Sequence, residues 1–337
     1  MNFSSLIQKL LEKESLHLEE MAFAMKSLMA GQVAEEEIVS FLTALRDKGE
    51  SRDEIVAAAQ VMREFSVKVS VHPDNLVDTC GTGGDNSGTF NLSTAAAFVV
   101  AGAGVRVAKH GNRAVSSQAG SADVLEALGV KIDLEPVQVR KCLVESGFGF
   151  FFAPRFHPAM KNVAAARKKI GTRTIFNLLG PLTNPTTPLA QVIGVYDRKK
   201  MLLLAEVLKD LGSRHVLLVN GDDGLDEVTL TGKTYIVELV EGKILETEID
   251  PKTFGFEVVT PEKLKGKDAA HNAFLLKGIL EGFEGSLRLA VLLNAAAAFV
   301  AVGRALSFEE GITVAEHSLD QGHAYQVLKD VIRISNE

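Results

Sequence analysis

From Leu76 onward, the sequence alternates short apolar segments with longer amphipathic segments, and this alternation constrains the fold more than any other feature. Short apolar strands that alternate with helices predict a mostly parallel sheet with helices on both faces. Residues 234–250 predict a β-hairpin, and the segments after it read as helices. The expected strands cover residues 76–80, 105–111, 148–154, 191–197 and 214–221.

The first part of the chain, up to about residue 70, has a pattern that is typical of helices. Apolar residues recur every three or four positions in residues 16–30 and 35–49. Ser51 and Glu54 have the spacing of a capping box, which predicts the start of another helix. The expected fold class is therefore α/β: a small all-helical domain precedes a larger α/β domain with a mostly parallel central sheet.

Composition excludes several classes of protein. The chain has 337 residues, enough for about two domains of ordinary size. Its formal net charge of −7 argues against a nucleic-acid partner, which normally needs a basic face. The two cysteines, Cys80 and Cys142, lack CxxC spacing, so we expect neither a disulfide framework nor a zinc site. This cysteine usage suits a reducing compartment.

No segment predicts secretion or membrane insertion. The N-terminal residues carry acids and lysines where a signal peptide needs an apolar core. Residues 289–303 are strongly apolar, but they are too few to span a bilayer and contain Asn294, which predicts a buried helix instead. We expect a cytoplasmic protein without a membrane partner.

Residues 77–94 (VDTCGTGGDNSGTFNLST) place four glycines between an expected strand and an expected helix. The dinucleotide motif GxGxxG fails because its sixth position is Asn86, and the P-loop motif fails because Thr89 stands where lysine is required. Glycines allow backbone N–H groups to converge on an anion, and the following helix adds its N-terminus. The segment predicts a phosphate cradle, with a tight strand-to-helix turn as the alternative.

A second polar cluster, KHGNR at residues 109–113, follows the next expected strand. Open α/β sheets bind ligands at the carboxyl ends of their strands, so this cluster suits a second phosphate group. Ser121 lies at the start of the helix that follows, where it can either bind the ligand or cap the helix.

Two further clusters suit a metal ion and a carboxylate ligand. Asp226 and Glu227 follow the strand at 214–221, and adjacent carboxylates suit Mg²⁺ shared with substrate phosphates. His157 and Arg167 lie ten residues apart, about 15 Å along a helix, so they cannot grip one carboxylate together. Arg167 is the better anion ligand because its charge is permanent and its donors form a fork. His157 either lines the same approach or caps the helix.

A resemblance to a known family is carried by six segments, in this order: GTGGD…TFNLST, VAKHGNRAVSS, GSADVLEALG, RFHPAMKNV, GTRTIFNLLGPLTNP and GLDEV. The chain closely resembles the anthranilate phosphoribosyltransferases of tryptophan biosynthesis, which have the nucleoside phosphorylase-like fold of glycosyltransferase family 3. The resemblance covers essentially the full chain. It implies a helical domain at residues 1–70, completed by helices around 158–185, and a phosphoribosyl-diphosphate-binding α/β domain at 76–337. It also implies a homodimer that packs through the helical domains.

The resemblance implies that phosphoribosyl moves from 5-phosphoribosyl 1-diphosphate to the amine of anthranilate, with Mg²⁺ as cofactor. The residues implied to bind the diphosphate donor are Gly81, Gly84, Asp85, Thr89, Asn91, Leu92, Ser93, Thr94, Lys109, His110, Gly111, Asn112, Arg113, Ala114, Val115, Ser116, Ser117 and Ser121. Those implied to bind anthranilate are Gly81, His110, Asn112, His157 and Arg167. Ser93, Asp226 and Glu227 are implied to hold the metal, and Lys109, Asn112 and Arg167 to act in catalysis.

Gln118 departs from the lysine or arginine often seen at its position in that family. Two alternatives are weighed against the transferase. A pyrimidine nucleoside phosphorylase shares the architecture, but it needs no Asp-Glu metal pair. A nucleic-acid-binding relative with little transferase activity is disfavoured by the acidic net charge of this chain. A complex with the preceding pathway enzyme is left open by the residues.

Overall fold

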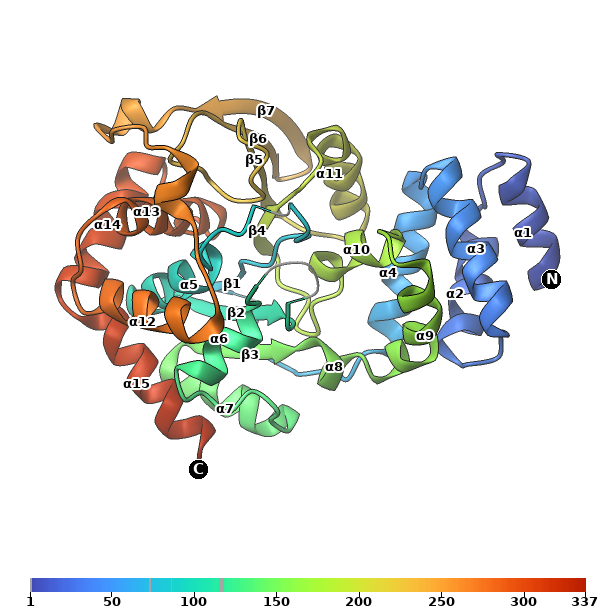
Figure 1. Cartoon of the computed structure of the whole chain (residues 1–337), viewed down its shortest axis with the longest axis horizontal. Coiled ribbons are helices and arrows are strands. Elements are labelled where there is room, and N and C mark those ends of the chain that lie inside the picture. The colour runs from blue at the N-terminus through green and yellow to red at the C-terminus, as the bar shows by residue number, and fades with distance from the viewer. Residues whose placement is uncertain (1, 73, 86, 115–117) are drawn as a thin grey trace.

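The computed structural model describes residues 2–72, 74–85, 87–114 and 118–337, and it contains a seven-stranded sheet in the order β3-β2-β1-β4-β5-β6-β7 (Figure 1). The strands are β1 (Leu76–Asp78), β2 (Arg106–Gly111), β3 (Phe148–Phe152), β4 (Ala190–Gly194), β5 (His215–Gly221), β6 (Thr234–Val240) and β7 (Lys243–Ile249).

The first five strands are parallel, as the alternation of strands and helices predicts. The strands β6 and β7 form the expected antiparallel hairpin, and β6 joins the sheet antiparallel to β5. The shortest strand, β1, lies in the middle, where it pairs with β2 on one side and with β4 on the other. The predicted fold class, a mostly parallel sheet within an α/β architecture, is confirmed.

Alternate residues of the central strands face two different apolar clusters, as a fully buried sheet requires. On β4, Val192 faces one cluster and Ile193 faces the other. The first cluster packs the sheet against the helices shown in cyan and orange to red in Figure 1. These helices are α5 (Leu92–Gly102), α12 (Ala269–Leu280), α13 (Ser286–Ala301), α14 (Phe308–Asp320) and α15 (His323–Ser335).

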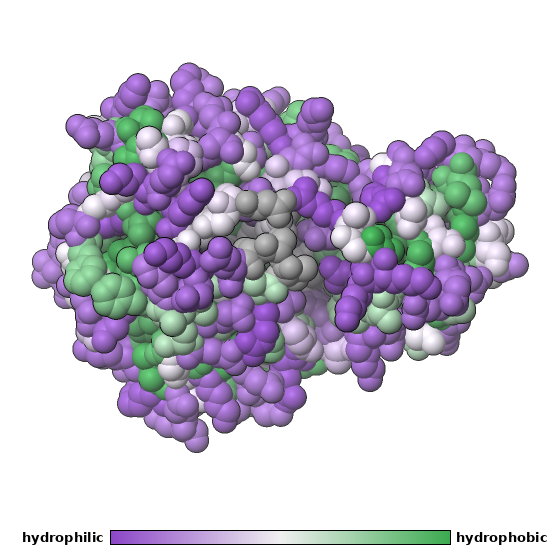
Figure 2. Space-filling view, viewed as in Figure 1, coloured by the Kyte–Doolittle hydropathy of each residue, from purple (hydrophilic) through white to green (hydrophobic). Residues whose placement is uncertain are grey.

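The opposite face of the sheet packs on α11 (Met201–Asp210), which in turn packs on a helical bundle. The bundle contains α1 (Phe3–Leu11), α2 (Leu18–Met29), α3 (Glu35–Lys48), α4 (Arg52–Phe65), α9 (Lys161–Ile170) and α10 (Ile175–Leu179). A single apolar cluster runs from this bundle through α11 to β4, β5 and β6. Figures 1 and 2 show the bundle as a smaller body beside the larger sheet domain.

Three short helices complete the connections around β2 and β3. They are α6 (Ser121–Ala127), α7 (Pro136–Ser146) and α8 (Ala153–Phe156). The stretch from 158, expected as one helix, begins as a 3-10 turn at Pro158–Met160 and becomes α-helical at Lys161. The proline ring fixes φ at a value that suits the first turn of a helix.

The helix α13 contains the apolar residues 289–303 up to Ala301, and its middle turns are buried in the core as expected. Its Asn294 is satisfied there: the amide donates to the carbonyl of Val228 at 2.8 Å and accepts from the N–H of Val228 at 3.0 Å. None of the helices formed by the described residues is both long and apolar enough to cross a membrane.

The predicted capping box at Ser51 is present and is part of a buried ion pair. The Glu54 carboxylate accepts from the N–H of Ser51 at 2.7 Å and from the N–H of Leu16 at 2.8 Å. It also pairs with Lys48 at 2.9 Å, and both side chains are almost completely buried. One carboxylate therefore joins the start of α4, the end of α3 and the loop before α2.

We expect Glu54→Ala to destabilise the chain by about 3–5 kcal/mol, because it leaves the Lys48 ammonium buried without its partner. Urea unfolding of the variant measures the change. Glu64→Ala is the matched control, because Glu64 pairs with Lys26 at 3.1 Å on the surface and such pairs contribute at most about 1 kcal/mol. Equal stability of the two variants would contradict the prediction.

Candidate active site

The candidate site lies where the carboxyl ends of β1, β2, β4 and β5 meet. Strands β2 and β3 extend the sheet on one side of β1, and strands β4 to β7 extend it on the other side. The strand order therefore reverses between β1 and β4. Ligands of open α/β sheets bind in the crevice at such a reversal. The glycine-rich segment follows β1 and lies at this point, and KHGNR forms the end of β2.

The glycine-rich segment needs its glycines for backbone conformation. Gly83, Gly84 and Gly88 have φ of +65°, +82° and +65°, which side chains rarely adopt. The N–H of Gly83 donates to the Asp226 carboxylate at 2.8 Å, and the N–H of Thr82 donates to the Gly194 carbonyl at 2.8 Å. The loop is therefore fixed to the end of β4 and to the segment that follows β5.

Gly194, at the end of β4, was not identified from the sequence. A Cβ atom there would lie 1.6 Å from the carbonyl oxygen of Asp226, so the end of β4 is in direct backbone contact with the segment that follows β5. A Cβ atom on Gly81 would lie 3.1 Å from the Gly194 carbonyl and 3.2 Å from the Asp226 carboxylate. The pattern QVIGVYD contains no signal for this contact, because it joins residues far apart in the sequence.

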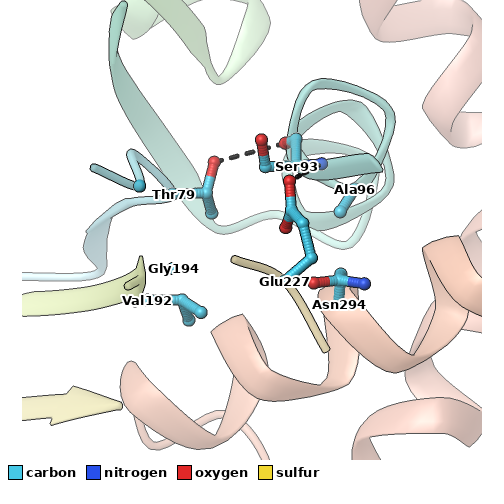
Figure 3. A pocket seen from close by; sticks show the side chains of 8 residues that line it. Thr79, Ser93, Ala96, Val192, Gly194, Glu227 and Asn294 are labelled. Atoms are coloured by element: carbon cyan, nitrogen blue, oxygen red, sulfur yellow. Dashed lines mark hydrogen bonds between the residues drawn. The ribbon is translucent and has the colours of Figure 1, made fainter. Parts of the chain in front are cut away.

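Ser93 and Glu227 lie together at the first turn of α5 (Figure 3), and the Lys109 ammonium reaches the same turn. The N–H of Ser93 donates to Glu227 at 3.2 Å, which places a carboxylate at the positive end of the helix. The Lys109 ammonium donates to the Thr79 carbonyl at 2.8 Å and to the Ser93 hydroxyl at 3.3 Å. A small pocket here is lined by Thr79, Gly81, Ser93, Ala96, Val192, Gly194, Glu227 and Asn294.

The carboxyl groups at this site repel one another. Desolvation, followed by the charges of Asp85 and Glu227, raises the pKa of Asp226 well above its ordinary value. Desolvation raises the pKa of Glu227 to about 7, although Lys109 and the N–H of Ser93 oppose the shift. Acids that are difficult to ionise in this way would be stabilised in their charged form by a bound cation.

Lys109 is the buried cation of the site, with 2% of its surface exposed. Desolvation lowers its pKa, and the nearby Cys80, Asp78 and Glu227 oppose that shift. Asp78 is itself fully buried, and its pKa is raised by desolvation to about 6. It accepts from the N–H of His110 at 3.2 Å and from the Asn184 amide at 2.9 Å, so it holds the end of β2 in place.

The segment after β2 is arranged around Asp123 on α6. Its carboxylate accepts from the N–H groups of Gly120 at 2.9 Å and Ala114 at 3.0 Å, and it pairs with Arg113. The interpretation of Ser121 as the helix cap is wrong, because Gly120 occupies the capping position and Asp123 satisfies its N–H. The Ser121 hydroxyl donates instead to the carbonyl of Asn112 at 3.4 Å.

Several predicted donor-binding residues have structural partners of their own. Arg113 is exposed and pairs with Asp123 and Glu126. The Asn91 amide donates to the Ala119 carbonyl at 3.1 Å and accepts from Asn272 at 2.9 Å, so it fixes the loop between the strand and α5. Leu92, Thr94 and Lys109 are buried, and Thr89 and Ala114 are half-buried. Val115, Ser116 and Ser117 lie outside the described residues.

The two predicted aromatic-acid residues His110 and His157 lie edge to face, with ring centroids 5.1 Å apart. The Nδ1 atom of His110 bonds the Gly180 carbonyl at 2.9 Å. The Nε2 atoms of both rings are buried and have no partner among the described residues. Burial lowers the pKa of His110 to about 4 and that of His157 to about 3, so both rings are neutral at pH 7.

Two arginines on the bundle side of the molecule lie over aromatic rings. Arg167, on α9, lies over the Phe176 ring at 5.2 Å, and burial lowers its pKa. Arg173, which precedes α10, lies over the Tyr196 ring at 3.7 Å. Arg173 was not identified from the sequence, since GTRT gives no sign that its arginine crosses to the segment after β4.

The arrangement suits a polyphosphate with an associated cation. Backbone N–H groups at a glycine-rich loop and a helix N-terminus attract an anion, and a buried ammonium group adds charge. The neighbouring acids suit a hard cation such as Mg²⁺, which is usually held by one or two carboxylates and by substrate phosphates. Among the described residues, no group of three or more His, Cys, Asp or Glu side chains is placed to hold a metal ion by itself.

We expect His110 and His157 to add a positive slope to the dependence of stability on pH between about 6.5 and about 4, whereas the raised pKa values of Asp78 and Glu227 contribute in the opposite direction. In that range the unfolded chain takes up protons on His110 and His157, whereas the folded chain does not, because their pKa values are lowered. His157→Phe should reduce this slope by up to about 1.4 kcal/mol per pH unit. Urea unfolding at several pH values measures it, and an unchanged slope would refute the prediction.

Comparisons with known proteins identify the family. Residues 4–66 match the helical bundle domain, and residues 73–325 the a/b domain, of a glycosyl transferase family. An anthranilate phosphoribosyltransferase of Bradyrhizobium sp. (strain ORS 278) is 50% identical over 99% of each chain. One from Alkaliphilus metalliredigens is 49% identical over 98% of each chain.

Solved structures agree. The anthranilate phosphoribosyltransferase of Thermus thermophilus superposes with a TM-score of 0.93 at 43% identity and covers 98% of this chain and 99% of its own. The Saccharomyces cerevisiae enzyme, in complex with PRPP and Mg, superposes with a TM-score of 0.91 at 30% identity and covers 99% of this chain and 98% of its own. By sequence, fold and coverage, the chain belongs to the anthranilate phosphoribosyltransferase family.

Proposed function

We propose that this chain transfers the phosphoribosyl group of 5-phosphoribosyl 1-diphosphate to the amine of anthranilate at the site between β1 and β4. The observation that carries the proposal is the convergence of the glycine-rich loop, the N-terminus of α5, the buried Lys109 and the acids Asp226 and Glu227. Each feature suits a metal diphosphate, and family membership supplies the reaction.

On the donor side, the backbone N–H groups of Gly81, Gly84 and Asp85 would bind the diphosphate. Those of Thr82 and Gly83 already donate to Gly194 and Asp226, and that of Ser93 donates to Glu227. Asp226, Glu227 and the Ser93 hydroxyl would hold Mg²⁺, and the raised pKa values of the two acids support this assignment because a cation would relieve their repulsion. When bound, Mg²⁺ neutralises the negative charge of the leaving diphosphate. Structures of the yeast relative with PRPP and Mg, and of a variant of it with Mg bound, also support a metal in this fold.

The reaction breaks the bond between ribose C1 and the diphosphate oxygen, and a bond from C1 to the anthranilate nitrogen forms. Positive charge develops on the sugar and negative charge on the leaving diphosphate. Lys109 and the backbone N–H groups are preorganised for the second of these charges, which is where we place most of the catalytic effect. The aniline nitrogen is neutral at pH 7 and loses its proton after attack, so a strong general base is not required.

On the acceptor side, Asn112 and Arg167 would orient anthranilate so that its amine faces ribose C1, a positioning effect. The neutral rings of His110 and His157 would line its approach, and their buried Nε2 atoms support the assignment because they have no other partner among the described residues. A complex of the yeast relative with 4-fluoroanthranilate is consistent with acceptor binding in this fold.

The direct test is the loss of anthranilate fluorescence when the chain is mixed with 5-phosphoribosyl 1-diphosphate and Mg²⁺. Omitting each component in turn should abolish the loss. A pyrimidine nucleoside phosphorylase would instead release a base from a nucleoside and phosphate, and a nucleic-acid-binding relative would be retained on DNA at low salt. The relatives found give neither alternative support.

We also propose that the chain is a cytoplasmic homodimer that packs through its helical bundle. Leu11 and Leu18, at neighbouring ends of α1 and α2, are exposed apolar residues on that bundle and would lie on the surface that the proposal assigns to the dimer. The proposed domains are residues 1–70, completed by helices around 158–185, and residues 76–337. The packing of α9 on α3 and of α10 on α4 supports that division.

Arg167→Ala should raise the anthranilate KM about tenfold or more, because a charge-assisted hydrogen bond to the carboxylate is lost. The KM for the diphosphate donor should change little. Steady-state kinetics with each substrate varied measures both, and Lys168→Ala, an exposed neighbour on the same helix, is the control. Unchanged anthranilate kinetics in a folded Arg167→Ala variant would reject the assignment.

Replacing both acids, as Asp226→Asn with Glu227→Gln, should lower Mg²⁺-dependent turnover by about 10² or more, because charge stabilisation of the leaving group is lost. Turnover measured over a range of Mg²⁺ concentrations tests this. Asp222→Asn is the control, because Asp222 is an exposed acid of the same turn region. Wild-type rates at limiting Mg²⁺ would contradict the metal assignment.

A further inference from the structure

Arg173 contacts the glycine-rich loop from the side of the helical bundle. A Cβ atom built on Gly84 would lie 3.1 Å from Nη2 and 3.2 Å from Nε of Arg173, so the guanidinium lies directly against the backbone of Gly84. Gly84 also has a φ of +82°. Glycine is therefore required there both for the backbone conformation and for the approach of the guanidinium.

The same guanidinium also lies over the ring of Tyr196, 3.7 Å from its centroid. The N–H of Tyr196 donates to the hydroxyl of Thr82 at 3.2 Å, so the residue that carries the ring is fixed to the glycine-rich loop. The guanidinium is thus held between the loop and the segment that follows β4. Cation–π contacts of this kind are stronger where water is excluded, and Arg173 and Tyr196 are both half-buried.

The charge of Arg173 suits this position. The loop it contacts carries Asp85 and lies against Asp226, two acids whose mutual repulsion contributes to the raised pKa of Asp226. Among the described residues, Arg173 forms no ion pair with a carboxylate, so its charge is not neutralised by a partner side chain. A planar, permanently charged group in this place opposes the repulsion and favours an anion over the loop.

The segment that carries Arg173 belongs to the bundle side of the molecule. Its neighbour Thr172 accepts a hydrogen bond from Arg46 of α3 at 2.6 Å, and the N–H of Thr174, just before α10, donates to the Asn177 side chain at 3.0 Å. Arg167, proposed above to bind anthranilate, lies six residues earlier on α9. One short segment thus connects the proposed acceptor-binding helix with the loop proposed to bind the diphosphate.

We infer that Arg173 is a positioning residue for the donor: stacked on Tyr196, it holds the glycine-rich loop at Gly84 in the conformation that binds a diphosphate. The inference rests on the proposed function of this loop. It assigns Arg173 to diphosphate binding through the loop, and it separates Arg173 from Arg167, which acts on the acceptor.

Calorimetric titration with inorganic diphosphate and Mg²⁺, in the absence of anthranilate, tests the inference without turnover. Arg173→Leu should weaken diphosphate binding about tenfold or more and raise the donor KM by a similar factor, because the loop loses the group that fixes it. The anthranilate KM should change little. Arg173→Lys, which keeps the charge but not the plane, should recover part of the affinity.

Tyr196→Leu should weaken diphosphate binding in the same way. The double variant should bind diphosphate with about the affinity of the weaker-binding single variant, because both substitutions remove the same interaction. Arg198→Leu is the matched control: Arg198 also lies 3.7 Å from a tyrosine centroid, but that ring is Tyr235 on β6. Thermal unfolding of each variant establishes that it is folded.

The inference would be overturned if Arg173→Leu and Arg198→Leu bound diphosphate with equal affinity. It would also be overturned if Arg173→Leu changed only the anthranilate KM, or if the effects of Arg173→Leu and Tyr196→Leu were fully additive. Failure of the unsubstituted chain to bind diphosphate with Mg²⁺ would overturn the proposed function itself, so the two failures are distinguishable.

Discussion

The parallel pairing of β1 with both β2 and β4 is the constraint on which the site depends. Since all three strands run the same way, their carboxyl ends meet, and the residues that follow them lie together although they are far apart in the sequence. The glycine-rich loop, Lys109 and Gly194 reach one place through this pairing alone. The strand β5, parallel to β4, then brings Asp226 and Glu227 to the same edge.

Groups of opposite charge lie next to one another at this edge of the sheet. A buried ammonium group lies beside acids whose pKa values are raised by desolvation and by one another. In the folded chain alone this cluster of charges is unfavourable. The proposed metal diphosphate would supply a cation for the acids and an anion for Lys109. Sites that perform chemistry often hold such unfavourable groups in place by the rest of the fold.

The features that could be predicted from the sequence are local ones. The order of strands and helices, the hairpin and the capping box at Ser51 follow from periodicity and from the conformational needs of single residues. The contact of Gly194 with Asp226 and the stacking of Arg173 on Tyr196 could not be predicted from pattern, because each depends on how two distant loops approach. The capping interpretation of Ser121 failed for another reason: Asp123, three residues after Gly120, satisfies the N–H group of Gly120 at the helix start.

The apolar cluster that joins the helical bundle to the sheet through α11 also limits how the molecule can open. A rigid swing of the bundle away from the sheet domain would separate α4 from α11 and bring their shared apolar side chains toward water, at about 1.5–3 kcal/mol for each one fully exposed. This cost favours an arrangement in which the bundle and the sheet domain move as one frame unless a bound ligand offsets it.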